Sequence, residues 1–327
     1  MSKPKLFATH VLFEEPRRRL AEHFDVEYWN GNERPPRAEV LKRVARKDAL
    51  ICLLTEKIDR ELLDAAGPNL RIAANVAVGY DNIDVPACTE RRVAVTNTPG
   101  VLDETTADFT WALLMAVSRR LVEADRLARS GAWRQWNLDQ LCGTDIWGKT
   151  LGIIGFGRIG RAVARRAAGF HMRVIYNSTT RAPAEIEREL NAEFMERERV
   201  LAEADFLSLH VPLRENTRGL IGPAELAKMK RTAFLINTTR GPVVQEAALV
   251  TALELGTIAG AALDVFEREP LISEGLRRDN VVLAPHLGSA SIETRTKMAL
   301  IAVENAIALF SGKQPSTILN PEVLRQN

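Results

Sequence analysis

The stretch LGIIGFGRIG, residues 151–160, decides the fold because an apolar, β-rich segment runs directly into a glycine-rich turn. Gly155, Gly157 and Gly160 have the G-x-G-x-x-G spacing, and the following AVARRAAGF has helical character. In a βαβ unit of this kind the first glycine permits the tight turn, the second lets the backbone approach a pyrophosphate, and the third lets the helix pack closely on the strand. The motif therefore predicts a dinucleotide-binding unit with its phosphate site at a helix N-terminus.

Short β-rich segments alternate with helical ones on both sides of this motif. The segments from the motif onward are residues 150–154, 172–176, 206–211, 233–237, 258–265 and 280–284. Those before it are residues 6–11, 49–54, 71–76 and 93–97. This alternation is typical of parallel sheets covered by helices on both faces. We predict an α/β protein with two doubly wound parallel-sheet domains: a Rossmann dinucleotide-binding domain and a smaller, flavodoxin-like substrate domain.

Two long helical patterns suggest how the domains are connected. Apolar residues with helical spacing continue from 103 to 131, which predicts one long helix linking the two halves. A second run, 289–310, needs an apolar partner surface, which we expect the N-terminal half to provide. The substrate domain is therefore expected to comprise residues 1–99 and 289–327, and the dinucleotide-binding domain residues 100–288.

Composition excludes several classes of function. The 327 residues carry 44 Lys and Arg against 42 Asp and Glu, a balance that argues against a nucleic-acid or membrane-surface binder. The most apolar run, residues 109–117, is shorter than the roughly 20 residues that span a bilayer. Cys52, Cys88 and Cys142 are too few and too scattered for a zinc site or a disulfide framework. We expect no metal, and a protein of the cytoplasm, since the N-terminus also lacks a secretory apolar segment.

The turn after the second strand of the Rossmann unit bears on the choice of cofactor. An NAD-selective site places Asp or Glu there, on the ribose hydroxyls, whereas this chain has Asn177-Ser-Thr-Thr-Arg181. These groups donate hydrogen bonds to a 2′-phosphate that a carboxylate would repel. We predict that NADP(H) is preferred and that NAD is possible, unless Arg181 points into solvent and the turn is indifferent to the phosphate. The cofactor-binding residues expected from the glycine turn and this turn are Gly155, Phe156, Gly157, Arg158, Ile159, Gly160, Asn177, Ser178, Thr179 and Arg181.

Three polar residues follow strands of the second series. Arg240 comes after FLINTT, Glu269 after LDVFER and His286 after VVLAP. Doubly wound sheets bind ligands at the carboxyl ends of their strands, so these side chains are expected to meet in one crevice. Reduction of a 2-oxo acid needs a cation to hold the carboxylate and polarise the carbonyl, a proton donor, and a group that keeps the donor charged. Arg240, His286 and Glu269 match these needs in that order. Taken singly, each has a structural alternative: a surface ion pair, a core histidine or a solvated acid.

Six strings in this sequence carry a family resemblance. They are NVAVGYDNIDV (75–85), VTNTPGVLDETTAD (95–108), GKTLGIIGFGRIG (148–160), INTTRGPVVQEAAL (236–249), AALDVFEREP (261–270) and LAPHLGSASIETR (283–295). In their order and over nearly the whole chain, they resemble the D-isomer-specific 2-hydroxyacid dehydrogenase family. The ETTAD and LICLLTEKID segments and the polar cofactor turn are most similar to its glyoxylate/hydroxypyruvate reductase branch.

The resemblance implies the same catalytic roles for Arg240, Glu269 and His286, and further site residues. Asp264 would accept a hydrogen bond from the nicotinamide carboxamide, and the backbone around Val78 and Gly79 would hold the substrate carboxylate. The additional cofactor-binding residues that it implies are Thr106, Thr238, Thr239, Asp264 and Gly288. The substrate-binding residues that it implies are Leu53, Val78, Gly79, Arg240 and His286.

We therefore expect an enzyme that transfers a hydride from NAD(P)H, preferably NADPH, to glyoxylate or hydroxypyruvate and forms the D-2-hydroxy acid. A 2-ketogluconate or other 2-keto acid reductase is the alternative within this class. A dinucleotide-sensing interaction protein, like the corepressors related to this family, is the alternative outside it. The resemblance also implies a homodimer whose contact lies near Trp133 and Trp136, with Trp136 a candidate to reach the partner's active site.

Overall fold

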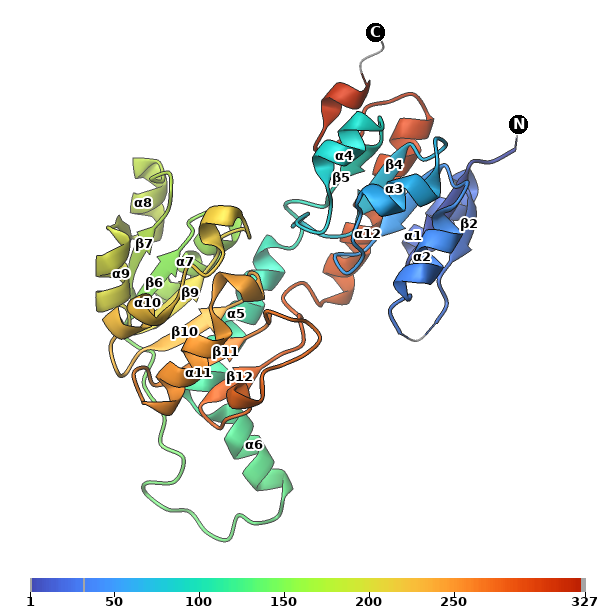
Figure 1. Ribbon diagram of the computed structural model, residues 1–327. Coiled ribbons are helices and arrows are strands. Elements are labelled where there is room, and N and C mark those ends of the chain that lie inside the picture. The colour runs from blue at the N-terminus through green and yellow to red at the C-terminus, as the bar shows by residue number, and fades with distance from the viewer. Residues whose placement is uncertain (1, 32, 325–327) are drawn as a thin grey trace. The chain divides into compact units, whose positions relative to one another are not determined.

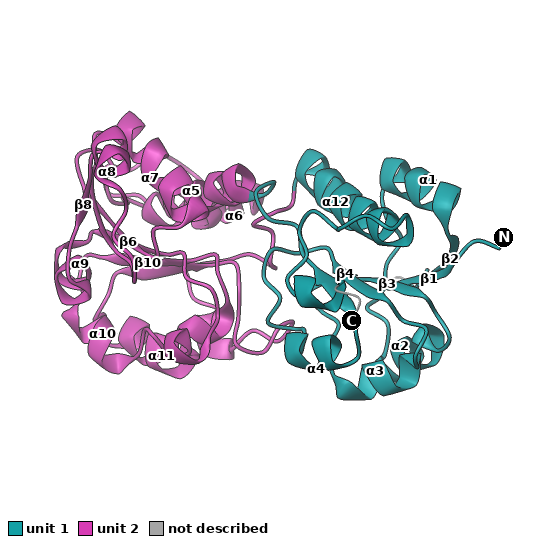
Figure 2. Cartoon of the chain, turned by 90° about the horizontal axis from the view of Figure 1, so that it is seen from above, with its two compact units in different colours: residues 1–102, 291–327 teal, residues 103–290 magenta. Residues whose placement is uncertain are grey.

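The chain divides into two compact units. The structure is a computed structural model, and it describes residues 2–31 and 33–324. Unit 1 comprises Met1–Leu102 and Ser291–Asn327, and unit 2 comprises Asp103–Ala290 (Figure 2). The chain thus crosses between the units a few residues later than the sequence analysis places the domain boundaries.

Unit 1 is built on a five-stranded parallel sheet with the order β2-β1-β3-β4-β5. Its strands are β1 (Lys5–Ala8), β2 (Asp25–Tyr28), β3 (Ala49–Cys52), β4 (Ile72–Asn75) and β5 (Ala94–Thr96). One face is covered by α1 (Glu14–His23) and α12 (Ile292–Phe310), and the other by α2 (Arg37–Val44), α3 (Arg60–Ala66) and α4 (Val85–Glu90), as Figure 2 shows. This is the predicted doubly wound, flavodoxin-like arrangement.

Unit 2 is built on a seven-stranded parallel sheet with the order β12-β11-β10-β9-β6-β7-β8. Its strands are β6 (Thr150–Ile154), β7 (Arg173–Asn177), β8 (Ala192–Phe194), β9 (Phe206–Leu209), β10 (Phe234–Asn237), β11 (Gly260–Leu263) and β12 (Val281–Leu283). One face is covered by α5 (Asp103–Ser118), α7 (Arg158–Ala167) and α8 (Ala184–Leu190), and the other by α9 (Arg197–Glu203), α10 (Pro223–Lys228) and α11 (Glu246–Glu254). The sheet order reverses next to β6, and the predicted Rossmann fold is confirmed.

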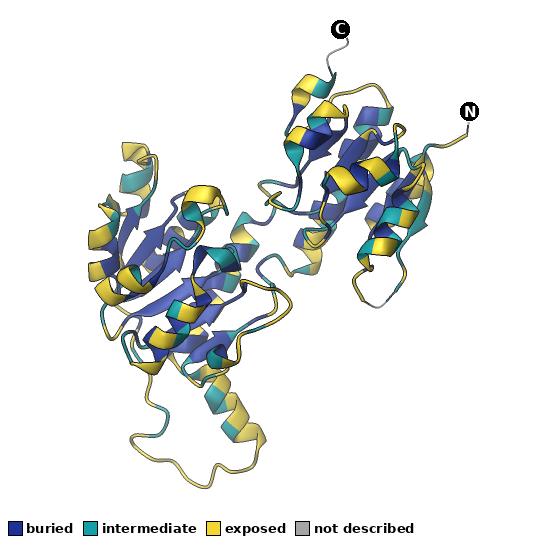
Figure 3. Cartoon of the chain, viewed as in Figure 1, coloured by how far each residue is buried: buried dark blue, intermediate teal, exposed yellow. Residues whose placement is uncertain are grey.

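The strands at the centre of each sheet are buried on both faces. β3 and β4 in unit 1 and β9, β10 and β11 in unit 2 consist entirely of buried residues (Figure 3). Parallel strands between two helical layers need apolar residues at most positions, which is why they appear in the sequence as nearly continuous apolar runs. The short 3₁₀ helices are η1 (Ala168–Phe170), η2 (Glu215–Thr217), η3 (Gly241–Val243), η4 (Glu274–Leu276) and η5 (Pro321–Leu324).

The single long helix expected over residues 103–131 is instead two helices, α5 and α6 (Leu121–Arg129). Arg120, between them, has a left-handed φ of 49°. The carbonyl of Ser118, which a continuous helix would pair with the residue four positions on, accepts the N–H of Thr144 at 2.8 Å. A returning chain segment therefore takes the hydrogen bond that helix continuation needs. The prediction of an unbroken helix was wrong.

Two short strands were also missed. β2 pairs with β1 at one edge of its sheet, and β8 pairs with β7 at one edge of the other. Their sequences, DVEY and AEF, mix charged and apolar residues because edge strands are only partly covered. Continuous apolar runs therefore indicate the central strands better than the edges.

Helix α6 and the loop after it extend away from the rest of unit 2 (Figure 1). No residue of α6 is buried, and the loop exposes large apolar side chains. The exposed apolar residues of this segment, residues 121–147, are Leu121, Val122, Trp133, Trp136, Leu138 and Trp147. Within the described residues, no helix has both the length and the apolar character that crossing a membrane requires.

Candidate active site

The glycine turn joins β6 to α7, and its glycines differ in what they contact. Gly155 has a φ of 95°, and a Cβ there would collide with the carbonyl oxygen of His210. A Cβ on Gly160 would collide with the carbonyl oxygen of Gly155. Gly157 has an ordinary φ of −76°, and apart from its immediate chain neighbours no described atom lies within 4 Å of the position of its Cβ. The fold needs the first and third glycines, whereas the open space beside Gly157 suits the approach of a ligand.

This turn is suited to an anion. Gly157 is the N-cap of α7 and has no side chain to cap the N–H groups of the first turn, which are therefore available to a phosphate. Phe156 is buried and stacks on Tyr176, with the ring centroids 3.9 Å apart, which holds the turn on β7. Arg158 is exposed, and its Nε lies 3.4 Å from a carboxylate oxygen of Asp103. The residues present thus fit a dinucleotide diphosphate.

Two polar side chains of the turn after β7 already have hydrogen-bond or ion-pair partners in the structure. The side-chain amide of Asn177 donates to the carbonyl of Met195 at 2.8 Å. Arg181, which the sequence analysis assigns to the 2′-phosphate, forms an ion pair with Glu187 at 2.9 Å. Ser178 is partly exposed and Thr179 exposed. The structure therefore shows a counter-ion for Arg181 that sequence reasoning missed.

Several cofactor residues implied by the resemblance lie close together in unit 2. A Cβ on Gly288 would lie 3.2 Å from a carboxylate oxygen of Asp264 and 3.4 Å from the methyl group of Thr106. The hydroxyl of Thr238 lies 2.9 Å from that of Thr110, which also donates to the carbonyl of Thr106. Thr110, on the buried face of α5, thus links the turn after β10 to the start of that helix.

The loop that carries Arg240 is shaped by Asn237, the last residue of β10. The Asn237 side chain accepts hydrogen bonds from the N–H and hydroxyl of Thr239, and it donates to the carbonyl of Arg240. A Cβ on Gly241 would overlap the backbone of Phe266, so the two loops are in direct contact there. This close approach brings the loop of Arg240 against the loop that leads to Glu269.

Glu269 and His286 are directly bonded. Nδ1 of His286 lies 2.8 Å from Oε2 of Glu269, and Oε1 of Glu269 accepts the N–H of Phe266. The pKa of Glu269 is lowered, although burial by itself raises it. Burial is outweighed by the hydrogen bond and charge of His286, by the hydrogen bond from the Phe266 N–H and by the charge of Arg240. The three residues assigned to catalysis thus influence one another within unit 2.

Asp264 holds the turn that carries His286. Its two carboxylate oxygens accept the N–H groups of Leu287 and Gly288, at 2.6 and 2.7 Å, and its carbonyl accepts the N–H of His286. Burial raises the pKa of Asp264 to about 6, against the lowering effect of these N–H groups. The implied contact between Asp264 and a nicotinamide stays a prediction, and the structure adds the support of the histidine turn.

The substrate-binding residues implied for unit 1 follow β3 and β4. Asn75 and Asn97 donate to the carbonyls of Gly79 and Val78, respectively. The N–H of Leu53 donates to the buried carboxylate of Glu56 at 2.8 Å. Leu53, Val78 and Gly79 thus lie in loops that buried polar side chains hold in place, in a different unit from Arg240 and His286.

Sequence reasoning missed the residues that shape these loops. Asn75 and Asn237 end apolar strands directly before short turns, and such asparagines commonly hydrogen-bond the turn backbone. That signal could have identified them. Nothing in the pattern around Glu56 indicated burial, because an isolated Glu in a polar loop is usually solvated.

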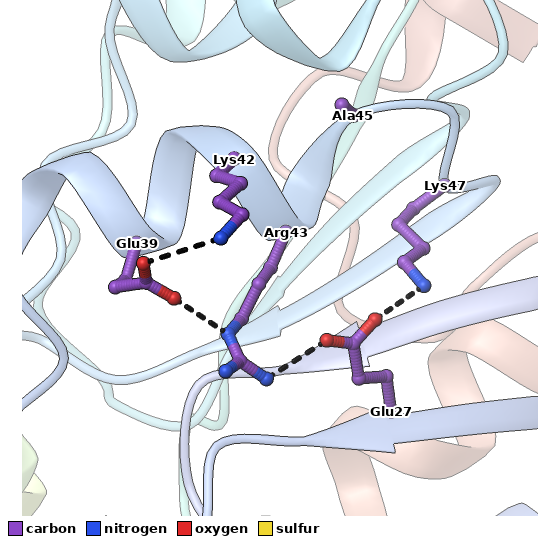
Figure 4. Close-up of a pocket in the computed structure, with 6 residues that line it drawn as sticks. All are labelled: Glu27, Glu39, Lys42, Arg43, Ala45 and Lys47. Atoms are coloured by element: carbon purple, nitrogen blue, oxygen red, sulfur yellow. Dashed lines mark hydrogen bonds and ion pairs between the residues drawn. The ribbon is translucent and has the colours of Figure 1, made fainter.

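A shallow surface pocket of about 300 Å³ lies elsewhere in unit 1. Its charged side chains are joined to one another by ion pairs between Glu27, Glu39, Lys42, Arg43 and Lys47 (Figure 4). These groups satisfy one another, and the pocket contains none of the predicted site residues. Within residues 2–31 and 33–324, no His, Cys, Asp and Glu side chains form a group that could hold a metal ion.

The fold and site define a dinucleotide-binding oxidoreductase of the α/β class. Residues 111–288 match the family described as D-isomer specific 2-hydroxyacid dehydrogenase, NAD binding domain. The chain is 51% identical over 326 residues to a glyoxylate reductase from Korarchaeum cryptofilum, covering 99% of this chain and 98% of that one. A crystal structure of an NADPH-dependent glyoxylate/hydroxypyruvate reductase from Sinorhizobium meliloti, in complex with NADP and malonate, has a TM-score of 0.86 and 36% identity, covering 100% and 99% of the two chains.

The chain therefore belongs to the D-isomer specific 2-hydroxyacid dehydrogenase family, on the branch of its glyoxylate reductase relatives. It is an enzyme, as the sequence analysis predicts.

The glycine turn makes a direct prediction. Gly157→Ala should leave the free energy of unfolding within about 0.5 kcal/mol of the wild type, because its Cβ meets open space, and should weaken dinucleotide binding at least about tenfold. Gly160→Ala should cost roughly 1–3 kcal/mol of stability, because its Cβ meets backbone. Chemical denaturation and calorimetric titration measure the two effects. Equal stability losses in both variants would contradict the distinction.

Asp264 should make stability depend on pH. Its folded pKa, about 6, lies above its ordinary value of 3.8, so the stability it contributes is present below pH 3.8 and is lost as the pH rises through about 6. Asp264→Asn cannot ionise, so the wild type should lose roughly 1–3 kcal/mol relative to this variant between pH 4 and 6. Denaturation at a series of pH values measures this difference. Asp139→Asn, at an exposed site in unit 2, is the control. A difference between wild type and Asp264→Asn that stays constant over this range would contradict the raised pKa.

Proposed function

We propose that this enzyme reduces glyoxylate, and hydroxypyruvate as a second substrate, to the corresponding D-2-hydroxy acid, with NADPH preferred and NADH possible. The observation that carries the proposal is the 2.8 Å hydrogen bond between His286 and Glu269, in the same unit as the glycine turn and within electrostatic reach of Arg240. An imidazole paired with a carboxylate beside a guanidinium is the set of groups that reduction of a 2-oxo acid requires.

Each of the three side chains has a defined task. Arg240 stays protonated throughout and holds the substrate carboxylate while polarising the carbonyl. His286 donates a proton from Nε2 to the carbonyl oxygen, since Glu269 occupies Nδ1. The Glu269 carboxylate binds Nδ1 and fixes the ring orientation, so that Nε2 faces the substrate. When bound, the reduced nicotinamide supplies the hydride for the carbonyl carbon. In the oxidative direction His286 accepts the proton.

The cofactor would be held by the residues assigned from the sequence. Backbone N–H groups of the Gly155–Gly160 turn would receive the diphosphate, and Asp264 with Thr106, Thr238 and Gly288 would lie towards the nicotinamide. The preference for NADPH is supported by a turn that contains no Asp or Glu between Asn177 and Arg181, and by the Sinorhizobium meliloti relative, which is described as NADPH-dependent. The substrate assignment is supported by the glyoxylate reductase relatives.

The domain roles and the setting of the enzyme belong to the same proposal. Unit 2 would bind the dinucleotide, and unit 1 would supply substrate contacts from Leu53, Val78 and Gly79. Three cysteines, none of them in a disulfide, suit a reducing compartment such as the cytoplasm. The exposed apolar segment of residues 121–147 would form a homodimer contact, because aromatic side chains are enriched at such interfaces.

The absorbance of NADPH tests the function. We expect oxidation of NADPH with glyoxylate and hydroxypyruvate to be faster than with pyruvate or 2-ketogluconate, and faster than oxidation of NADH.

His286→Gln should lower kcat for reduction by about 10²–10⁴-fold at neutral pH, because the proton donor is lost, with cofactor affinity nearly unchanged. Arg240→Ala should lower kcat and raise the KM for the 2-oxo acid, because this residue is proposed to bind the substrate carboxylate and to polarise the carbonyl. Faster turnover of 2-ketogluconate would reassign the substrate, and binding of NADPH without turnover of any 2-oxo acid would favour a dinucleotide-sensing interaction protein.

The homodimer proposal is tested by sedimentation. The wild type should sediment at twice the 36.3 kDa chain mass. Replacing Trp136, 72% exposed, and Leu138, 83% exposed, with serine should raise the dimer dissociation constant by roughly 10–100-fold, as the loss of buried apolar anchors does. Leu255→Ser, at a 71% exposed apolar site outside the segment, is the control. A wild-type monomer at micromolar concentration would refute the proposal.

A further inference from the structure

Arg181 is held by a carboxylate that is itself anchored to the core. Nε of Arg181 donates to Oε1 of Glu187, on helix α8, and Nη2 donates to Oε2, both at 2.9 Å. The hydroxyl of Tyr176 donates to Oε1 of Glu187 at 2.6 Å and accepts the N–H of Ala182 at 2.9 Å. These bonds form one network across the turn between β7 and α8.

Arg181 and Glu187, the two charged residues of this network, differ in how far their side chains are exposed to solvent. Tyr176 is fully buried and stacks on Phe156 of the glycine turn, and the Glu187 side chain is only 12% exposed. The Arg181 side chain is 65% exposed, and its guanidinium carbon lies over the Phe194 ring, 5.7 Å from the ring centroid. Glu187 is therefore the fixed partner, and the Arg181 guanidinium is the one able to turn towards a ligand.

The charges in this network nearly cancel. The hydrogen bonds from Arg181 and then Tyr176 lower the pKa of Glu187, so its carboxylate is ionised at neutral pH. A 2′-phosphate approaching this turn would meet a guanidinium whose Nε–Nη2 edge is already engaged and whose charge is balanced. The Glu187 carboxylate thereby cancels the attraction that the Arg181 guanidinium would otherwise exert on a phosphate charge. A ribose with free hydroxyls carries no such charge and would be little affected.

We propose that Glu187 is a specificity-determining residue that limits the preference for a 2′-phosphorylated dinucleotide by neutralising Arg181. This inference rests on the proposed dinucleotide site. It makes the discrimination between NADPH and NADH a property of the Arg181–Glu187 pair rather than of Arg181 alone. The enzyme would thus keep measurable use of both cofactors, although its turn contains a guanidinium and three hydroxyls.

Glu187→Gln tests the proposal, because the amide oxygen still accepts from Tyr176 and Arg181 while the charge is removed. We expect this variant to bind NADPH and adenosine 2′,5′-bisphosphate roughly three- to tenfold more tightly than the wild type, with the affinity for NADH and 5′-AMP changed by less than about twofold. Calorimetric titration measures all four affinities without turnover. Glu189→Gln is the matched control on the same helix, since Glu189 pairs with Arg165 instead.

A second variant tests whether Glu187 acts through Arg181. In an Arg181→Ala background, Glu187→Gln should give no more than about a twofold gain in affinity for the 2′-phosphorylated ligands. A gain as large as in the wild type would overturn the assignment, as would an unchanged or weaker NADPH affinity in the single variant. If the wild type bound neither NADPH nor NADH, the proposed dinucleotide site would fail and this inference with it. If the wild type bound both and Glu187→Gln changed nothing, only the inference would fail.

Discussion

The hydrogen bonds from the turn after β12 to Asp264 are the constraint on which the site depends. His286 has a φ of 57°, a left-handed conformation that costs of order 1–3 kcal/mol for a residue with a side chain. Three N–H groups, those of His286, Leu287 and Gly288, donate to the carbonyl and carboxylate of Asp264 and offset that cost. Hydrogen bonds from two N–H groups to a buried carboxylate are strong, and water does not readily replace them. The backbone geometry that brings Nδ1 of His286 within 2.8 Å of Glu269 is therefore maintained by Asp264.

The order of strands in unit 2 explains why three distant residues come together. Arg240 follows β10, Glu269 follows β11 and His286 follows β12, and these strands are neighbours in the sheet. Neighbouring parallel strands lie about 5 Å apart and end at the same edge, so loops that leave their carboxyl ends are brought together by the sheet itself. The contact between Gly241 and the Phe266 backbone then closes the remaining gap. Topology supplies the approximate placement, and local packing supplies the geometry.

The sequence predicted the parts of this arrangement that have a regular pattern. Buried central strands appear as apolar runs, the glycine turn has a characteristic spacing, and strand ends identify Arg240, Glu269 and His286 as a group. Features that depend on a contact between distant segments had no such pattern. The break between α5 and α6 depends on Thr144 reaching Ser118, and the partner of Arg181 depends on which face of α8 meets β7. The Asp264–Gly288 bond is of the same kind. A side chain's residue type limits what it can bind, but the fold decides which partner it finds.

Two carboxylates lie near one imidazole, and their surroundings move their pKa values apart. Burial raises the pKa of Asp264 to about 6, whereas the pKa of Glu269 is lowered, because the effects of His286, the Phe266 N–H and Arg240 exceed that of burial. As the pH falls from neutral, Asp264 takes up a proton before Glu269 does. A protonated carboxyl has one oxygen that carries hydrogen, so it accepts the N–H groups of Leu287 and Gly288 less well, while Glu269 stays ionised. Acid therefore weakens the hydrogen bonds to Asp264 that position His286 before it neutralises Glu269, although protonation of Asp264 stabilises the folded chain by removing a buried charge. The two acids thus have different structural tasks: Asp264 fixes the place of the imidazole, and Glu269 orients its ring.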